Sequence, residues 1–415
     1  MIKVAKTILA IGPVSQTGAA FIHFATLERL RTVFGYRVYA YALSDPDIIN
    51  KKYPQISIEY NSLSGSYNSV INNTLSLIST QEKMIRNGLE LYEKGKIITV
   101  FATYLFPYAF IASNVKLALE SFNIPVKLLV QPAGSDIWKY GTTFQKTFQQ
   151  ILVNSNSILS YSAKFAKELE NILHVRDTKL CTPEINTNQF KPVTNEVKLQ
   201  RRSKLGLNNT DIILICISNN RYIKAIENCI ILSNYLADRN HLPTWLLIIG
   251  PSSPELEKSL NSMQTLPPGP NGENRYTTGI LSIAWFGTVS DVTGFLHAAD
   301  IFINTSYHDS FNTSLGEAMA SGIPVISSSI VGIKEYIRDH KVGYFFDYTP
   351  IPFADLQKTI NINIPFDQME KVNNFFQKFI TDIEYAKLLK EDCRRFIEEY
   401  FSWDALHIQY AQIFE

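Results

Sequence analysis

The segment HDSFNTSLGEAMASGIPV combines two carboxylates with the signals of a helix start. Seven residues separate Asp309 from Glu317, and the helix start lies between the two. The helix is predicted to begin near Thr313 or Ser314 and to end at Gly322. Backbone N–H groups and the dipole at a helix N-terminus attract anions, and carboxylates accept hydrogen bonds from sugar hydroxyls. This combination predicts a site for a nucleotide-diphosphate sugar.

The same residues also fit a purely structural role. In Ser314-Leu-Gly-Glu317 a serine is followed three residues later by a glutamate, which is the pattern of a capping box. In that interpretation Glu317 returns a hydrogen bond to the start of its own helix. From these residues alone, both interpretations stay open.

The elements that must position this segment alternate between strand-like apolar runs and helical patterns along the whole chain, as in parallel α/β sheets. The pattern restarts with DIILICIS after a polar, proline-containing stretch around Phe190. We therefore expect two Rossmann-like, doubly wound domains, residues 1–190 and 191–399, followed by a helix at about 400–415. Residues 264–279, which are rich in Pro and Gly, are expected to form an exposed loop.

Composition and charge narrow the class of protein. The chain has 415 residues, 46% hydrophobic and 19% charged, and a formal net charge of +1, which argues against a nucleic-acid-binding protein. Residues 1–190 hold 19 Lys or Arg against 13 Asp or Glu (+6), and the remainder holds 20 against 25 (−5). This difference in charge between the two halves either serves solubility alone or indicates that residues 1–190 bind an anionic partner or a membrane surface.

Several classes of site lack their sequence signals. The first strand-to-helix turn has Gly12 and Gly18 but no Gly-x-Gly-x-x-Gly pattern, which argues against NAD, while contact of Gly18 with phosphate or sugar stays open. The scattered cysteines and histidines predict no metal site. The scattered cysteines also suit a protein of the reducing cytosol. No apolar run is long enough to span a bilayer. We expect a cytoplasmic protein without a cofactor.

The carboxylate segment resembles the signature of retaining glycosyltransferases of family 4, which have the GT-B fold. Glu317-Ala-Met-Ala-Ser-Gly-Ile-Pro-Val-Ile is intact, Phe311 occupies the preceding turn, and Asp309 stands where the family has Glu. The upstream stretch IAWFGTVSDVTGFLHAADIFINTS is similar to the family's lead-in, with weaker similarity at residues 134–136 (GSD) and at FSWD. The resemblance implies two Rossmann-like domains facing a central cleft, with the C-terminal helix crossing back to the N-terminal domain.

The resemblance also implies roles for individual residues. Asp309 would hold sugar hydroxyls beside the reacting carbon, and Glu317 would hold the ribose. Backbone groups that would face sugar and phosphate belong to Phe311, Asn312, Thr313 and Ser314. Lys224 would contact the diphosphate. Asn219 stands where the family has Arg, and Arg221 would replace that Arg only in a reshaped loop.

The remaining positions concern the nucleotide base and the acceptor. Contacts around Thr288 and Val289 would select the base. Many relatives have His before Gly-Ser-Asp, where this chain has Ala133. Asp136 either contacts the acceptor or caps a helix, and both interpretations stay open.

The function implied is metal-independent transfer of a hexose from a nucleotide-diphosphate sugar, UDP-sugar above all, to an acceptor hydroxyl with retention of configuration. The acceptor would be a lipid-linked sugar, a polysaccharide or a small glycoside, with peripheral membrane contact through the basic half. Alternatives are a nucleotide-sugar epimerase, a sugar phosphorylase, or a non-catalytic nucleotide-sugar-binding protein.

Overall fold

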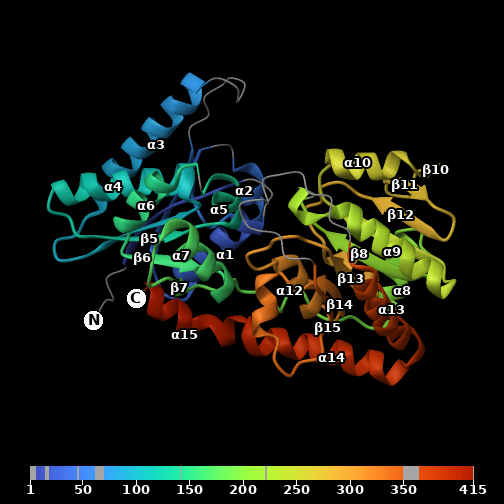
Figure 1. The fold of residues 1–415 in the computed structure, drawn as a ribbon. Coiled ribbons are helices and arrows are strands. Elements are labelled where there is room, and N and C mark those ends of the chain that lie inside the picture. Colours follow the sequence, from blue (N-terminus) through green and yellow to red (C-terminus); the bar gives the residue numbers. More distant parts are fainter. Residues whose placement is uncertain are drawn as a thin grey trace. The chain divides into compact units, whose positions relative to one another are not determined.

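The computed structural model divides into two compact units (Figure 1). Unit 1 comprises Met1–Thr182 and Ile408–Glu415, and unit 2 comprises Pro183–His407. The division falls a few residues before the boundary expected at residue 190. The structure describes residues 6–14, 18–43, 46–60, 70–141, 143–219, 222–348 and 364–414.

Unit 1 is built on a parallel sheet of seven strands in the order β3-β2-β1-β4-β5-β6-β7. The strands are β1 (Thr7–Ile11), β2 (Arg37–Ala42), β3 (Ile58–Tyr60), β4 (Ile98–Thr103), β5 (Val126–Gln131), β6 (Ser157–Ser160) and β7 (Lys179–Leu180). The helices are α1 (Gly18–Thr32), α2 (Asp47–Lys52), α3 (Val70–Leu91), η1 (Leu105–Ala109), α4 (Phe110–Ser121), α5 (Gly134–Tyr140), α6 (Gln145–Val153) and α7 (Ala163–Leu173). Strands β1 and β4 are buried along their whole length, as expected for parallel strands covered on both faces.

Unit 2 contains an eight-stranded sheet in the order β10-β11-β12-β9-β8-β13-β14-β15. Its strands are β8 (Ile212–Ile217), β9 (Thr244–Ile249), β10 (Gln264–Leu266), β11 (Asn274–Thr277), β12 (Leu281–Trp285), β13 (Ile301–Asn304), β14 (Val325–Ser328) and β15 (Gly343–Phe346). Its helices are α8 (Asn195–Lys204), η2 (Tyr222–Lys224), α9 (Ile226–Asn240), α10 (Pro254–Asn261), α11 (Thr293–Ala298), α12 (Thr313–Ala320), η3 (Gly332–Tyr336), α13 (Phe366–Thr381) and α14 (Ile383–Tyr400). The expectation of two doubly wound α/β domains is confirmed.

The segment expected to be an exposed loop forms instead the antiparallel hairpin β10–β11 at one edge of the unit 2 sheet. Its turn is held by the buried carboxylate of Glu273, which accepts from Asn271 N (3.0 Å) and pairs with Arg275 (2.5 Å). The Arg275 guanidinium also donates to Leu205 O (2.6 Å) and lies 5.0 Å from the ring centroid of Trp245. The Pro and Gly content predicted a loop here, because amino-acid composition does not show which polar side chains pair to order the strands.

The C-terminal helix α15 (Trp403–Phe414) joins unit 1 from Ile408 onward. Its carbonyls accept hydrogen bonds from unit 1 side chains: Lys127 Nζ donates to Ile413 O (2.8 Å), and the Tyr36 hydroxyl donates to Phe414 O. The chain therefore returns to its first unit at the end, as expected.

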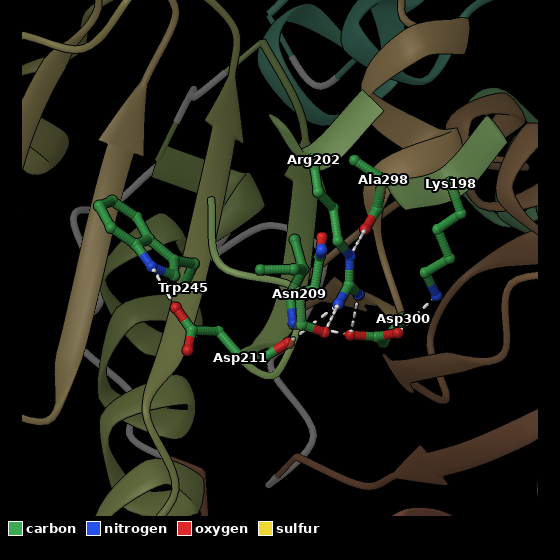
Figure 2. A network of polar contacts seen from close by, with 8 residues as sticks. Lys198, Arg202, Asn209, Asp211, Trp245, Ala298 and Asp300 are labelled. Atoms are coloured by element: carbon green, nitrogen blue, oxygen red, sulfur yellow. Dashed lines mark hydrogen bonds and ion pairs between the residues drawn. The ribbon is translucent and has the colours of Figure 1, made fainter. Parts of the chain in front are cut away.

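A buried ionic network ties α8 to the amino ends of β8 and β13 (Figure 2). Asp300 pairs with Lys198 (2.5 Å) and Arg202 (2.6 Å) and accepts from Ile213 N (2.8 Å). Burial alone would raise the pKa of Asp300, but the two positive charges outweigh it, and this pKa lies below its ordinary value. Because active sites of open α/β sheets lie at the carboxyl ends of strands, this network has a structural role.

Candidate active site

The predicted helix after β13 is α12, and its start differs from a capping box. The N-cap is Asn312, with φ 75° and ψ 79°, and its side chain accepts from Leu315 N (3.0 Å). Ser314 is the second helical residue and Glu317 lies in the second turn, half-buried. The capping-box interpretation is therefore wrong, because the cap is two residues earlier.

Helix α12 ends at Ala320, close to the predicted stop. Gly322 has φ 73°, and its N–H donates to Met319 O (2.9 Å), while Ile323 N donates to Ala318 O (3.0 Å). These two bonds form a Schellman motif, which favours glycine at this position. The helix is thus fixed at both ends, so the direction of its N-terminus is well defined.

Asp309 and Lys224 form an ion pair in front of this helix. Lys224 Nζ lies 2.5 Å from Asp309 Oδ2, and the side chains are only 17% and 12% exposed. The other carboxylate oxygen accepts from Phe311 N (3.3 Å). The two residues follow the neighbouring strands β13 and β8, at whose carboxyl ends ligands bind in this class of sheet.

Hydrogen bonds to backbone carbonyls hold the two loops that carry this pair. Thr305 Oγ1 donates to Ala225 O (2.7 Å), and Tyr307 N donates to Ile223 O (2.8 Å). On the far side, Gly332 N donates to Asp309 O (3.1 Å). Asp309 is therefore positioned by its own backbone as well as by Lys224.

A buried polar cluster beneath the loops was not expected from the sequence. Asn228 Nδ2 donates to the hydroxyls of Tyr307 and Tyr348 (3.1 Å each), and Tyr348 OH donates to Thr305 O (2.8 Å). Burial raises the pKa of Tyr348 well above its ordinary value, so this hydroxyl stays protonated and able to donate. The partners are distant in the chain, and no local pattern signals them.

The start of α12 offers donors for an anion next to the ion pair. N–H groups in the first turn of a helix have no partner within the helix, and Asn312 takes the one of Leu315. The N–H groups of Thr313 and Ser314 are those that the helix itself leaves over. With Lys224 they form a set of donors suited to a diphosphate, and Asp309 and Glu317 are acceptors suited to hydroxyl groups.

The other predicted site residues are placed as follows. Val289 is half-buried between β12 and α11 of unit 2. Gly18 is the first residue of α1 in unit 1. Arg221 lies outside the described residues.

Asp136 also belongs to unit 1, where it is 3% exposed at the start of α5. Its Oδ2 accepts from Leu105 N (2.9 Å) and Ala133 N (3.0 Å). Burial raises the pKa of Asp136 to about 7, although these backbone N–H groups oppose the shift. Of the two interpretations, these contacts favour the helix cap over acceptor contact.

Within the described ranges, no three His, Cys, Asp or Glu side chains gather closely enough to hold a metal ion. No helix in the described part of the chain is both long and apolar enough to cross a bilayer.

Part of the second unit matches a known protein family. Residues 197–360, which contain Lys224, Asp309 and Glu317, match the family described as glycosyl transferases group 1. The N-acetyl-alpha-D-glucosaminyl L-malate synthase of Bacillus anthracis is 22% identical over 312 residues, 75% of each chain.

Solved structures share the fold over nearly the whole chain. Sucrose-phosphate synthase from Thermosynechococcus elongatus superposes with a TM-score of 0.68 at 18% identity, covering 99% of this chain and 98% of its own. Anabaena Alr3699/HepE in complex with UDP and glucose gives a TM-score of 0.70 at 15% identity, covering 98% and 99%. The fold is therefore the two-domain GT-B fold.

Proposed function

Because residues 197–360 carry a glycosyl transferases group 1 domain, we propose that this protein is a retaining, metal-independent hexosyltransferase with a UDP-sugar as donor. The observation that carries the proposal is the Asp309–Lys224 pair next to the start of α12. UDP as the nucleotide is supported by HepE, whose structures contain UDP, glucose and UDP-glucose. The acceptor would be a hydroxyl of a lipid-linked sugar, a polysaccharide or a small glycoside.

In this proposal the donor replaces the ion pair with new contacts. The diphosphate binds Lys224 and the N–H groups of Thr313 and Ser314, which stabilise the charge that develops on the leaving nucleotide. Asp309, released from Lys224, accepts hydrogen bonds from the sugar, and Glu317 accepts them from the ribose. Backbone groups of Phe311 and Asn312 line the sugar side, and Val289 lies near the base.

Retention follows in this proposal from attack on the face that the phosphate leaves. The acceptor oxygen bonds to the anomeric carbon as the bond to the diphosphate oxygen breaks, and the departing phosphate takes the acceptor proton. No protein nucleophile is required by this scheme. A cytoplasmic location and membrane contact through unit 1 stay predictions.

The experiment follows the anomeric proton by NMR while the protein is incubated with UDP-sugars and a panel of acceptors. Wild type should release UDP and form a product with the donor's anomeric configuration, and Asp309→Asn should lower kcat by about a hundredfold or more. Lys371→Ala, which removes an exposed ion pair with Asp367 on α13, serves as control and should keep wild-type kcat. An inverted product would contradict retention.

Two results would point to the other candidate activities. Conversion of the donor without acceptor would indicate an epimerase, and dependence on inorganic phosphate would indicate a phosphorylase. Binding of nucleotide sugars without any turnover would indicate a binding protein and overturn the proposal.

A further inference from the structure

The turn that carries Lys224 has an unusual backbone. Ala225, which stands between Lys224 and helix α9, has φ 48° and ψ 50°, in the left-handed region. A residue with a Cβ atom rarely adopts this conformation unless its surroundings hold it there. Ala225 is also fully buried. The contacts that hold Ala225 therefore also fix the backbone of Lys224.

Two hydrogen bonds converge on the carbonyl oxygen of Ala225. The backbone N–H of Asn228 donates to it within the first turn of α9 (3.0 Å), and Thr305 Oγ1 also donates to it (2.7 Å). The same hydroxyl lies 3.5 Å from Lys224 O. Thr305 directly follows β13. Its hydroxyl thus bonds the Lys224 turn to the carboxyl end of that strand.

Side chains close these contacts into a ring. Tyr348 OH donates to Thr305 O (2.8 Å), and Asn228 Nδ2 donates to Tyr348 OH (3.1 Å). Because Asn228 N also binds Ala225 O, the chain of hydrogen bonds returns to the residue where it began. We call Ala225, Asn228, Thr305 and Tyr348 the hydrogen-bonded ring. Each of these residues is at most 6% exposed, so water competes little for their hydrogen bonds.

The hydrogen-bonded ring also reaches the loop of Asp309. Asn228 Nδ2 donates to Tyr307 OH as well (3.1 Å), and Tyr307 N donates to Ile223 O (2.8 Å). The aromatic rings of Tyr307 and Tyr348 meet edge to face, with their centroids 5.0 Å apart. Tyr307 precedes Asp309 by two residues. These contacts therefore hold the backbones that carry both members of the ion pair.

The hydrogen-bonded ring holds backbone and leaves the charged groups to a ligand. None of its bonds uses the ammonium group of Lys224 or the carboxylate of Asp309. The ammonium group can therefore exchange Asp309 for another anion while the backbone of Lys224 stays in place. A binding group that is held before its ligand arrives lowers the ordering cost of binding.

We propose that the hydrogen-bonded ring positions Lys224 for the diphosphate of the donor, and that Asn228 and Tyr348 are positioning residues of this site. The fixing of the Lys224 turn stands on the contacts alone, whereas the statement about the donor rests on the proposed function. Asn228 and Tyr348 touch no ligand in this scheme. They act on the affinity for UDP through Lys224.

Two variants of nearly unchanged shape open the ring at different points. Tyr348→Phe removes the hydroxyl that joins Asn228 to Thr305 O, and Thr305→Val removes the hydroxyl that binds Ala225 O. Each should raise the dissociation constant for UDP by about fivefold in isothermal titration, as expected for the loss of one hydrogen bond. Because both variants open the same ring, the double variant should lose little more affinity than either single variant.

Tyr410→Phe is the matched control. It also removes a buried tyrosine hydroxyl that donates to a backbone carbonyl, Thr182 O (3.2 Å), but in unit 1. Thermal unfolding of each variant sets a titration temperature at which it is folded. The control should bind UDP like wild type. An equal loss of affinity in Tyr410→Phe would overturn the proposal, because it would show a general effect of removing a buried hydroxyl.

A double-mutant cycle with Lys224 separates positioning from a general structural role. In the Lys224→Ala background, Tyr348→Phe should leave the remaining affinity for UDP unchanged, because the side chain that the ring positions is gone. A fivefold loss in both backgrounds, or in neither, would overturn the proposal.

Hydrogen exchange without ligand separates this proposal from the proposed function. The amides of Ala225 and Tyr307 should exchange faster in Tyr348→Phe than in wild type, because both loops are held less firmly. Faster exchange in a protein whose wild type binds no UDP would support the fixing of the turn and contradict the proposed function. Unchanged exchange and unchanged affinity in the variant of a protein that binds UDP would overturn the role of the ring alone.

Discussion

The two carboxylates of the candidate site have different neighbours and should contribute differently to catalysis. Asp309 is paired with Lys224 and fixed by its backbone, whereas Glu317 lies in the second turn of α12. We expect Asp309→Asn to lower kcat. Glu317→Gln should raise the donor KM about tenfold with kcat nearly unchanged, because the ribose contact proposed for Glu317 would be made equally in ground and transition states. Steady-state kinetics with varied donor check this, and equal loss of kcat in both variants would contradict it.

Asp136 should make stability depend on pH. In the folded protein its pKa is about 7 because of burial, whereas an unfolded Asp releases its proton near pH 4. The folded state therefore binds more protons between these values, and stability falls as pH rises through that window, by at most about 1.4 kcal/mol per pH unit. Above pH 7 this contribution is constant.

The neutral variant Asp136→Asn cannot titrate and should lack this fall. The measurement is the free energy of unfolding of wild type and variant from pH 4 to 8, compared as a difference at each pH. A difference that does not change with pH would contradict the raised pKa.

At the scale of elements, the start of α12 depends on the unusual conformation of Asn312. Its φ of 75° favours Asn or Gly, and its side chain supplies the cap for Leu315. Asn312→Ala should destabilise the protein by about 1–2 kcal/mol, because it loses the cap and strains the backbone. Asn312→Gly keeps the conformation and should cost less; chemical denaturation of both variants checks the order. The reverse order would contradict the role of the left-handed conformation.

The ionic network at the amino ends of β8 and β13 should contribute to stability and not to chemistry. Asp300→Asn leaves Lys198 and Arg202 buried without their counter-charge, which costs about 3–5 kcal/mol. Thermal unfolding should show the loss, while kcat at a temperature where the variant is folded should match wild type. A variant as stable as wild type but impaired in kcat would contradict this division of roles.

Local patterns in the sequence were sufficient for α12 but not for its surroundings. The helix and its stop at Gly322 were predictable because caps and glycine signals are encoded within a few residues. The cap itself was misplaced, because only the backbone conformation distinguishes Asn312 from Ser314. The pairing of Asp309 with Lys224 joins residues 85 positions apart and was not predicted, because the resemblance to a family gave each residue a separate ligand contact.

At the scale of the whole molecule, the returning helix α15 should stabilise unit 1 selectively. Tyr410, Ile413 and Phe414 are at most 3% exposed, and their helix belongs to unit 1 from Ile408 onward. Removing Ile408–Glu415 exposes this apolar surface and should lower protection against hydrogen exchange in β1, β4 and β5. Protection of β8 and β13 in unit 2 against hydrogen exchange should stay unchanged. Equal loss of protection in both units would contradict the assignment of this helix segment to unit 1.

The two α/β domains were predictable because apolar runs alternate with helical patterns along the chain. The edge hairpin β10–β11 was not predictable, because buried pairs such as Glu273–Arg275 order a segment that is rich in Pro and Gly. The near-zero net charge of the chain is the sum of a basic unit 1 and an acidic unit 2. In the proposed function, the acidic unit 2 binds the diphosphate through the local donors Lys224 and the start of α12, and not through its net charge.

Isothermal titration with UDP measures whether Lys224 and the start of α12 bind a diphosphate. Wild type should bind UDP, and Lys224→Ala should weaken the dissociation constant by about tenfold or more, because a charge-assisted contact to the diphosphate is lost. The control variant Lys371→Ala should bind like wild type. Unchanged UDP affinity in Lys224→Ala, or no binding of any nucleoside diphosphate to the wild-type protein, would show that these donors do not form a diphosphate site.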